Sequence, residues 1–180
     1  MKGETNKIHG EKRRQLILSW LKEENEPITG KELSTRTNVS RQVIVQDISL
    51  LKATGEPIIA TARGYVYLQE NNTIQKASRV IVVQHTASQT ADELYLMVDY
   101  GVTIRNVMVE HPIYGDITAS LMIKNRREVD VFITELRRTG ASLLSNLTEG
   151  VHLHTIEADQ EEQLDEACEA LRRAGYLLED

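Results

Sequence analysis

The chain has 180 residues, of which 41% are hydrophobic and 27% are charged. This composition supports one or two folded domains with apolar cores and excludes extended disorder. The formal net charge of −6 argues against a protein that binds nucleic acid over its whole surface. Residues 1–70 contain 11 basic and 9 acidic residues, whereas residues 71–180 contain 10 and 18. Binding to DNA is therefore expected only in the first part of the chain.

Cys168 is the single cysteine, so the chain forms no intramolecular disulfide. It shares a helical stripe with Leu164 and Leu171, which is typical of a buried structural thiol. The sequence shows no secretory signal and no apolar run long enough to span a bilayer. We therefore expect a cytoplasmic protein that has no membrane partner.

Residues 1–70 predict a winged helix-turn-helix domain, that is, three helices followed by a β-hairpin. Thr29 and Ser40 are suitable N-caps for the second and third helices. Thr61-Ala62-Arg63-Gly64 is expected to form the turn of the hairpin. The helices are expected at residues 10–24, 30–36 and 41–53, and the strands at residues 58–60 and 65–68.

The third helix carries the residues expected to read DNA. When its apolar stripe is turned inward, its first two turns expose a set of mainly polar side chains. This set consists of Arg41, Gln42, Val45 and Gln46. Arginine pairs with guanine, glutamine pairs with adenine, and valine covers a thymine methyl group. Arg63, in the hairpin turn, is expected to contact a phosphate or the minor groove. The alternative is an ordinary three-helix core with a solvated face, but it does not explain why these features coincide.

Residues 70–77 lose all periodicity and are expected to form a linker. Residues 78–180 then alternate between strand and helix patterns in the order βαββαβα. Two βαβ-type halves around one hairpin predict a ferredoxin-like α+β sandwich. The strands are expected at residues 79–85, 102–110, 116–123 and 151–156, and the helices at residues 90–100, 126–138 and 160–174.

The second domain contains a potential metal site. His152 and His154 are one residue apart on an expected strand and therefore point to the same face. In a ferredoxin-like sheet the first strand lies antiparallel beside the last, which brings His85 next to them. Glu93 lies in the first turn of the following helix, at the same edge. The four side chains suit Zn²⁺, Ni²⁺, Fe²⁺ or Mn²⁺. The alternative is that His152 and His154 lie on an exposed sheet face without a metal.

A further histidine, His111, ends the second strand, which runs parallel to the first and reaches the same sheet edge. The turn from Pro112 to Gly115 is expected to hold this imidazole and the Tyr114 phenol in fixed directions. A hairpin turn with a solvent-facing histidine is the alternative. The sequence shows no nucleophile–base pair, no glycine-rich phosphate loop and no carboxylate pair at catalytic spacing, so no catalytic residue is expected.

With these motifs, the sequence resembles the niacin-responsive transcriptional repressors of Gram-positive bacteria. These proteins combine a winged helix-turn-helix with a domain named for three histidines. The resemblance covers residues 12–177. The motifs that carry it are Val-Val-Gln-His85 with Glu93 downstream, Val-Glu-His111-Pro-Ile-Tyr-Gly-Asp-Ile, and Val-His152-Leu-His154.

The resemblance implies repression of genes for niacin salvage, niacin transport or NAD synthesis, with nicotinic acid as co-repressor. His85, Glu93, His152 and His154 match the metal ligands of the family, and His111 would face the effector pocket. Metal and nicotinic acid would then share one composite site, with Tyr114 at the other end of the ring.

We thus expect a dimeric transcription repressor and not an enzyme. The expected partners are operator DNA, nicotinic acid and a second copy of the chain. Dimerisation through the second domain is expected because both faces of its first strand are apolar, and helices cover only one of them. Two other functions remain open at this point: a regulator that senses the metal itself, and a metal-dependent hydrolase fused to a DNA-binding domain. The lack of a second general acid/base pair weighs against the hydrolase, and Glu110 near His111 keeps it open.

Overall fold

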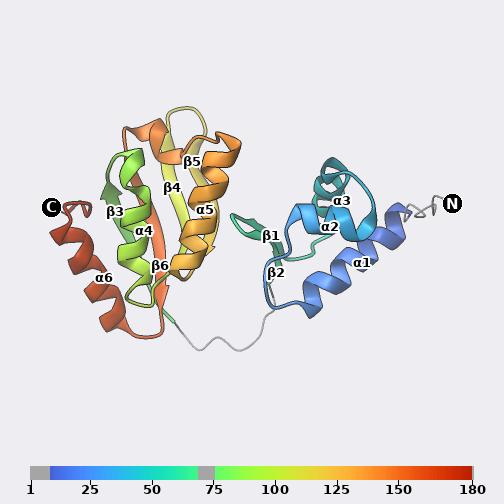
Figure 1. The fold of residues 1–180 in the computed structure, drawn as a ribbon, viewed down its shortest axis with the longest axis horizontal. Helices are drawn as coiled ribbons and strands as arrows, with labels where there is room; N and C mark the ends of the chain where they lie inside the picture. Colours follow the sequence, from blue (N-terminus) through green and yellow to red (C-terminus); the bar gives the residue numbers. More distant parts are fainter. Residues whose placement is uncertain (1–8, 69–75, 180) are drawn as a thin grey trace. The chain divides into compact units, whose positions relative to one another are not determined.

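This computed structural model describes residues 9–68 and 76–179. The chain divides into two compact units, Met1–Asn72 and Thr73–Asp180 (Figure 1). Most of the linker expected at residues 70–77 lies outside the described residues, although the first strand of the second unit already begins at Ala77.

The first unit is a winged helix-turn-helix, as predicted. Its elements are α1 (Gly10–Glu23), α2 (Gly30–Thr37), α3 (Arg41–Ala53), β1 (Ile58–Thr61) and β2 (Gly64–Tyr67). The Thr29 and Ser40 hydroxyls accept the backbone N–H groups of the third residue beyond each, which starts α2 and α3. Asn38 adopts a left-handed conformation with φ of 52°, which ends α2 and sets the turn into α3.

A buried ion pair joins α1 to α3. Arg13 Nε donates to Asp47 Oδ2 at 2.5 Å, and Arg13 Nη2 donates to Asp47 Oδ1 at 3.2 Å. The two residues are only 7% and 2% exposed. Because both charges are removed from water, their pairing is important for the stability of this unit. Arg14 Nη1 lies 3.6 Å from Asp47 Oδ1 and adds a second positive charge beside this carboxylate. The apolar core of the unit contains Ile17, Leu21, Ile28, Leu33, Ile44, Ile48, Leu51 and Ile58.

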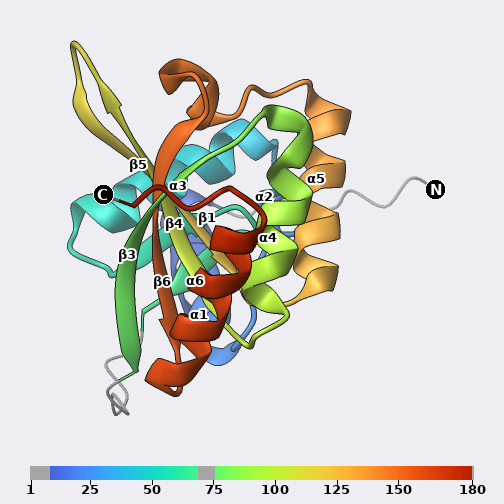
Figure 2. The ribbon, with the colours of Figure 1, turned by 90° about the vertical axis from the view of Figure 1, so that its left-hand side faces the viewer.

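The second unit is the predicted α+β sandwich with the order βαββαβα. Helices α4, α5 and α6 cover one face of the sheet (Figure 2). Its elements are β3 (Ala77–Gln84), α4 (Thr90–Val98), β4 (Thr103–His111), β5 (Gly115–Ile123), α5 (Arg126–Thr139), β6 (Val151–Ala158) and α6 (Glu161–Arg173), with short 3₁₀ turns η1 (Ala87–Gln89) and η2 (Leu144–Thr148).

The sheet has the strand order β3-β6-β4-β5, and all neighbouring strands are antiparallel. The expected antiparallel pairing of the first and last strands is therefore present, and β4 runs parallel to β3. The order departs from the usual ferredoxin-like sheet, in which the first and third strands are inside. Here the last strand (β6) and the second strand (β4) are inside, and the first (β3) and third (β5) lie at the edges. The succession of elements along the chain does not determine which strands take the inner positions. As a result, side chains of β6 are flanked by strands on both sides.

The core of the second unit lies between the sheet and the three helices. It includes Val83 and Ile156 from the sheet and Leu94, Leu164 and Cys168 from the helices. Cys168 is 6% exposed, in agreement with its expected structural role. Within the described part of the chain, no helix is long and apolar enough to cross a bilayer.

Replacing Asp47 by alanine tests the buried ion pair. We expect Asp47→Ala to lower the free energy of unfolding of the first unit by about 3–5 kcal/mol, because the Arg13 charge stays buried and loses the Asp47 carboxylate. Urea unfolding followed by tryptophan fluorescence reports on this unit alone, because Trp20 is the single tryptophan.

Glu24→Ala is the matched control, because it removes an exposed ion pair with Arg36 at 2.5 Å. Its expected cost is at most about 1 kcal/mol. Equal losses in the two variants would contradict a special role for the buried pair.

Candidate metal centre and DNA-binding surface

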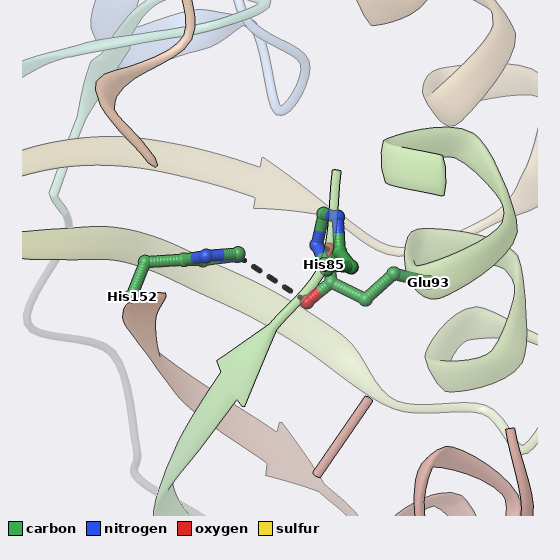
Figure 3. A group of neighbouring side chains, drawn as sticks. All are labelled: His85, Glu93 and His152. Carbon is green, nitrogen blue, oxygen red and sulfur yellow. Dashed lines mark hydrogen bonds and ion pairs between the residues drawn. The ribbon is translucent and has the colours of Figure 1, made fainter. Parts of the chain in front are cut away.

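Four buried side chains meet at one edge of the sheet. His85 follows β3 directly, Glu93 lies in the first turn of α4, and His152 and His154 alternate along β6. The register of β6 against β3 pairs His152 with Val83 and His154 with Ile81, so both imidazoles share the helix-covered face. Figure 3 shows His85, Glu93 and His152 pointing toward one another. The four residues are between 0% and 7% exposed.

The Glu93 carboxylate lies at the centre of this histidine cluster. Its Oε2 is 2.9 Å from His85 Nε2, while its Oε1 is 3.1 Å from His154 Nε2 and 3.5 Å from His152 Nε2. One ligand atom from each of His85, Glu93 and His152 lies within 4.8 Å of the others. The predicted convergence of the four residues is therefore present in the structure.

Backbone carbonyls fix the tautomer of all three imidazoles. The Nδ1 atoms lie 2.8 Å from the oxygen of Thr86 for His85, 2.9 Å from that of Gly150 for His152, and 2.6 Å from that of Asn106 for His154. A carbonyl oxygen only accepts, so each Nδ1 carries a hydrogen. In the neutral form each Nε2 then presents a lone pair toward Glu93. Imidazoles that bind metals are commonly oriented in this way.

When the three imidazoles are neutral, their Nε2 lone pairs face the oxygens of the Glu93 carboxylate, so hydrogen-bond acceptors lie opposite acceptors. Within the described residues, Glu93 Oε1 and His154 Nε2 are buried and have no hydrogen-bond partner. A buried polar atom without a partner costs on the order of 1–3 kcal/mol. A cation between the carboxylate and the imidazoles would satisfy every one of these lone pairs. The donor set and its unpaired atoms therefore fit a transition metal with nitrogen and oxygen ligands.

The electrostatics of the cluster also favour a positive charge beside Glu93. Burial alone would raise the pKa of the Glu93 carboxyl. When the imidazoles are protonated, the charge of His154 and hydrogen bonds from the Nε2–H groups of the three imidazoles hold this pKa well below its usual value. Burial alone would lower the pKa of His154, but the charge of Glu93 and its hydrogen bond raise it. The carboxylate is thus anionic at neutral pH and stabilises a cation beside it.

Gly150 supports the cluster and was not identified from the sequence. Its φ of +92° is unfavourable for other residues, and a Cβ atom there would lie 2.3 Å from the carbonyl oxygen of His85. Its own carbonyl accepts the hydrogen bond from His152 Nδ1. The signal in the sequence was a glycine directly before Val-His-Leu-His, and its meaning depends on the neighbouring strand, which the sequence does not show.

A cavity of about 170 Å³ opens beside the histidine cluster. The cluster forms its polar wall, and most of the remaining wall is apolar. The sequence did not indicate the contribution of α5 and of residues 142–145 to this cavity. Besides the four cluster residues, the lining consists of Thr90, Leu94, Val107, Ala119, Leu121, Phe132, Leu136 and residues 142–145.

The structure does not bring His111 and Tyr114 to this cavity within one copy of the chain. His111 Nδ1 accepts hydrogen bonds from the backbone N–H groups of Ile113 and Tyr114, at 3.2 and 3.3 Å. The rings of His111 and Tyr114 lie 4.9 Å apart, and Tyr114 is 78% exposed. Both residues reach the same sheet edge as the cluster, as the topology predicted, but they lie at the tip of the hairpin between β4 and β5.

The expected DNA-reading side chains lie on the outer face of α3. Arg41, Gln42, Val45 and Gln46 are all exposed, and Val45 is 40% exposed despite being apolar. Arg63 lies in the turn between β1 and β2, where its Nη2 donates to Glu26 Oε2 at 2.6 Å. A phosphate contact by Arg63 would therefore compete with this ion pair.

Comparisons with known proteins identify both domains of the chain. Residues 13–66 match the model of an HTH domain, and residues 78–180 match that of a 3H domain. The chain is 51% identical over 175 residues to the transcription repressor NadR of Bacillus subtilis (strain 168), covering 97% of each chain. It is 37% identical over 170 residues to the probable transcription repressor NiaR of Thermotoga maritima, covering 94% of this chain and 95% of that protein.

A helix-turn-helix domain in a chain whose relatives are named repressors defines a DNA-binding transcription repressor, and not an enzyme. The matched 3H domain and the two relatives specify it further. The chain belongs to the family of niacin-responsive transcription repressors.

Gly150→Ala tests how closely the two backbones must approach at the cluster. Gly175→Ala is the matched control, because Gly175 also has a positive φ, of 75°, but a Cβ there would meet nothing within 4 Å. Both variants carry the conformational cost of a positive φ, of about 1–2 kcal/mol. Gly150→Ala adds a clash with the His85 backbone, so we expect it to lower stability by about 1–3 kcal/mol more. Thermal unfolding followed by circular dichroism measures this difference, and equal unfolding temperatures would refute the close approach.

Proposed function

We propose that the chain represses genes of niacin salvage, niacin transport or NAD synthesis in the cytoplasm. In this proposal the first domain, residues 1–70, binds an operator, and the second, residues 78–180, binds a transition metal and nicotinic acid. The observation that carries the proposal is the buried histidine cluster, with its unpaired acceptors, at the wall of a small cavity.

The proposed metal ligands are His85, Glu93, His152 and His154. Three imidazole nitrogens and one carboxylate suit Ni²⁺, Zn²⁺, Fe²⁺ or Mn²⁺, and these donor types do not choose among them. An ion that prefers six ligands would retain positions for a further ligand from the cavity side. When bound, the metal would supply a Lewis-acidic contact for the effector, while the chain holds the imidazoles and excludes water around them.

Charge and size both favour nicotinic acid as the effector. Three neutral imidazoles, one carboxylate and a divalent ion leave a net charge of about +1 in a buried place, which calls for a monoanionic ligand. The cavity of about 170 Å³ is slightly larger than the 150 Å³ or so that suffices for benzene. A single aromatic ring with one carboxylate fits these limits, whereas a nucleotide does not.

A dimer is part of the proposal, because palindromic operators require two recognition helices. Helices cover only one face of the sheet in the second unit (Figure 2). On the other face Val80 is 56% exposed, and Val82 and Leu153, paired in register beside it, are half-buried. An apolar strip on an uncovered sheet face is a suitable contact for a second copy of the chain.

A regulator that responds to the metal alone is the second candidate, and the same cluster favours it. The two candidates differ in the cavity, because a metal sensor has no need of an apolar space that accommodates a ring. Titration of the metal-loaded protein with nicotinic acid distinguishes them by calorimetry.

Removing one ligand should abolish both metal and effector binding. We expect His152→Ala to retain far less metal after purification, because it removes one of four donors. Nicotinate affinity should fall in parallel, and chelation of the wild-type metal should have the same effect, since the two ligands are thermodynamically linked. Elemental analysis and calorimetry measure these quantities.

His9→Ala is the control, because His9 is exposed and lies in the first unit. It should keep both the metal and the effector affinity. A dissociation constant for nicotinate that is the same with and without chelator would mean two independent sites and would remove the coupling from the proposal.

If α3 reads the bases, substitutions at its start should change both the affinity for the operator and the sequence preference. We expect Arg41→Ala and Gln42→Ala each to weaken binding to the specific operator by about 1–3 kcal/mol and to relax its sequence preference. Lys52→Ala, at the exposed far end of the same helix, should leave that preference unchanged. Competition binding against operators with single base changes gives both values. Wild-type preference in both test variants would show that α3 does not read the bases.

A further inference from the structure

The tip of the hairpin between β4 and β5 is a firmly held apolar projection. Ile113 and Tyr114 are 82% and 78% exposed, the highest values for large apolar side chains in the described residues. The turn is nevertheless ordered, because β4 and β5 stay paired as far as His111 and Gly115, and His111 caps the turn. Exposed apolar groups on a rigid projection are typical of a contact surface.

His111 is prepared as a hydrogen-bond donor and not as a metal ligand. Its Nδ1 accepts hydrogen bonds from two backbone N–H groups, so in the neutral form the proton is on Nε2. This tautomer is the opposite of that in the histidine cluster, where Nδ1 carries the proton. The free Nε2–H of His111 is therefore suited to an anionic acceptor such as a carboxylate.

This donor is remote from the cavity of its own chain. Val107 lines the cavity, and His111 lies four residues further along the same strand, which is roughly 13 Å. The last residue of β4 that pairs with β6 is Met108, opposite Leu153. Figure 2 shows the hairpin leaving the sheet on the side away from the helices. Because that direction leads away from the cavity, a second copy is required for His111 to meet a bound effector.

The surface beside the cavity offers apolar side chains and a basic side chain that suit the hairpin. Leu136 and Leu143 line the cavity but are only half-buried, and Leu147 nearby is 55% exposed. Arg137, next to Leu136 in the last turn of α5, is exposed and has no ion pair among the described residues.

On the hairpin, two exposed carboxylates lie directly opposite each other in the strand register, Glu110 against Asp116. Like charges in such a cross-strand pair are destabilising unless a cation lies beside them. A single basic side chain would therefore gain from contact with both carboxylates, and Arg137 on another copy has the charge and the exposure to supply it.

We propose that the hairpin tip of one copy closes the cavity of a second copy, with Ile113 and Tyr114 on its apolar rim and Glu110 and Asp116 against its Arg137. His111 then donates its Nε2–H to the carboxylate of the bound effector. For the identity of that effector, the inference rests on the proposed function. Two-fold symmetry gives two such sites per dimer, and each site is incomplete in a monomer.

The contact between copies is tested first, in the full chain and without effector. Ile113→Asp combined with Tyr114→Ser should raise the dissociation constant of the dimer, measured by sedimentation at micromolar concentration, about tenfold or more, while the metal content stays unchanged. Arg137→Glu should weaken the dimer, and adding Glu110→Arg and Asp116→Arg to the same chain should restore it. A dimer as tight as that of the wild type in the first variant, or no rescue by the charge reversal, would overturn the interface.

The shared site is tested by mixing two defective chains with different affinity tags. One carries His152→Ala and has an intact hairpin; the other carries His111→Asn and has an intact metal site. Asparagine keeps a turn-capping oxygen at this position but removes the Nε2–H donor. Dimers of the second chain alone should bind nicotinate about tenfold or more weakly, the usual effect of losing a hydrogen bond to a charge.

In the mixed dimer, the intact hairpin of the His152→Ala chain closes the intact cavity of the His111→Asn chain. The other site of this dimer lacks both the His111 donor and a complete metal site. Calorimetry should therefore find one site per dimer with wild-type affinity. Absence of that site from the mixed dimer, or wild-type affinity in the His111→Asn dimer, would overturn the contribution from the second copy. Failure of the wild-type chain to bind nicotinate would instead refute the proposed effector, and the sedimentation results would still decide the interface.

Discussion

The second domain depends on one buried anion, the carboxylate of Glu93. It is completely buried and is surrounded by three imidazole nitrogens, of which the nearest lies at 2.9 Å. An isolated carboxylate in such a place would be strongly unfavourable. The surrounding structure is arranged accordingly: an inner strand supplies two imidazoles, three backbone carbonyls set their tautomers, and Gly150 allows the backbones to approach.

Much of this arrangement could be predicted from the sequence. Each predicted helix and strand ends within two residues of its observed position, because caps, glycines and periodic apolar residues fix local structure. The cluster was also predictable, because His152 and His154 alternate on one strand and the antiparallel pairing with the first strand adds His85. Only the chain order and the pairing of two strands were needed for that inference.

Other features could not be obtained from the sequence, for physical reasons. The inner position of β6 depends on packing across the sheet, which leaves no local pattern. The role of Gly150 depends on the carbonyl oxygen of His85, 65 positions earlier in the chain. The separation of His111 from the cavity depends on how far the hairpin continues beyond its last pairing with β6, and the topology alone placed all these residues at one edge.

The ion pair between Arg13 and Asp47 has a consequence for how operator preference evolves. Asp47 lies in the middle of α3 and is held on its inner side by a helix that makes no base contact in the proposed mode of binding. The helix therefore cannot rotate about its axis without separating two buried charges. New operator preferences are then accessible through the identity of the outward side chains, one base contact at a time, and not through a turn of the helix that would change all contacts together.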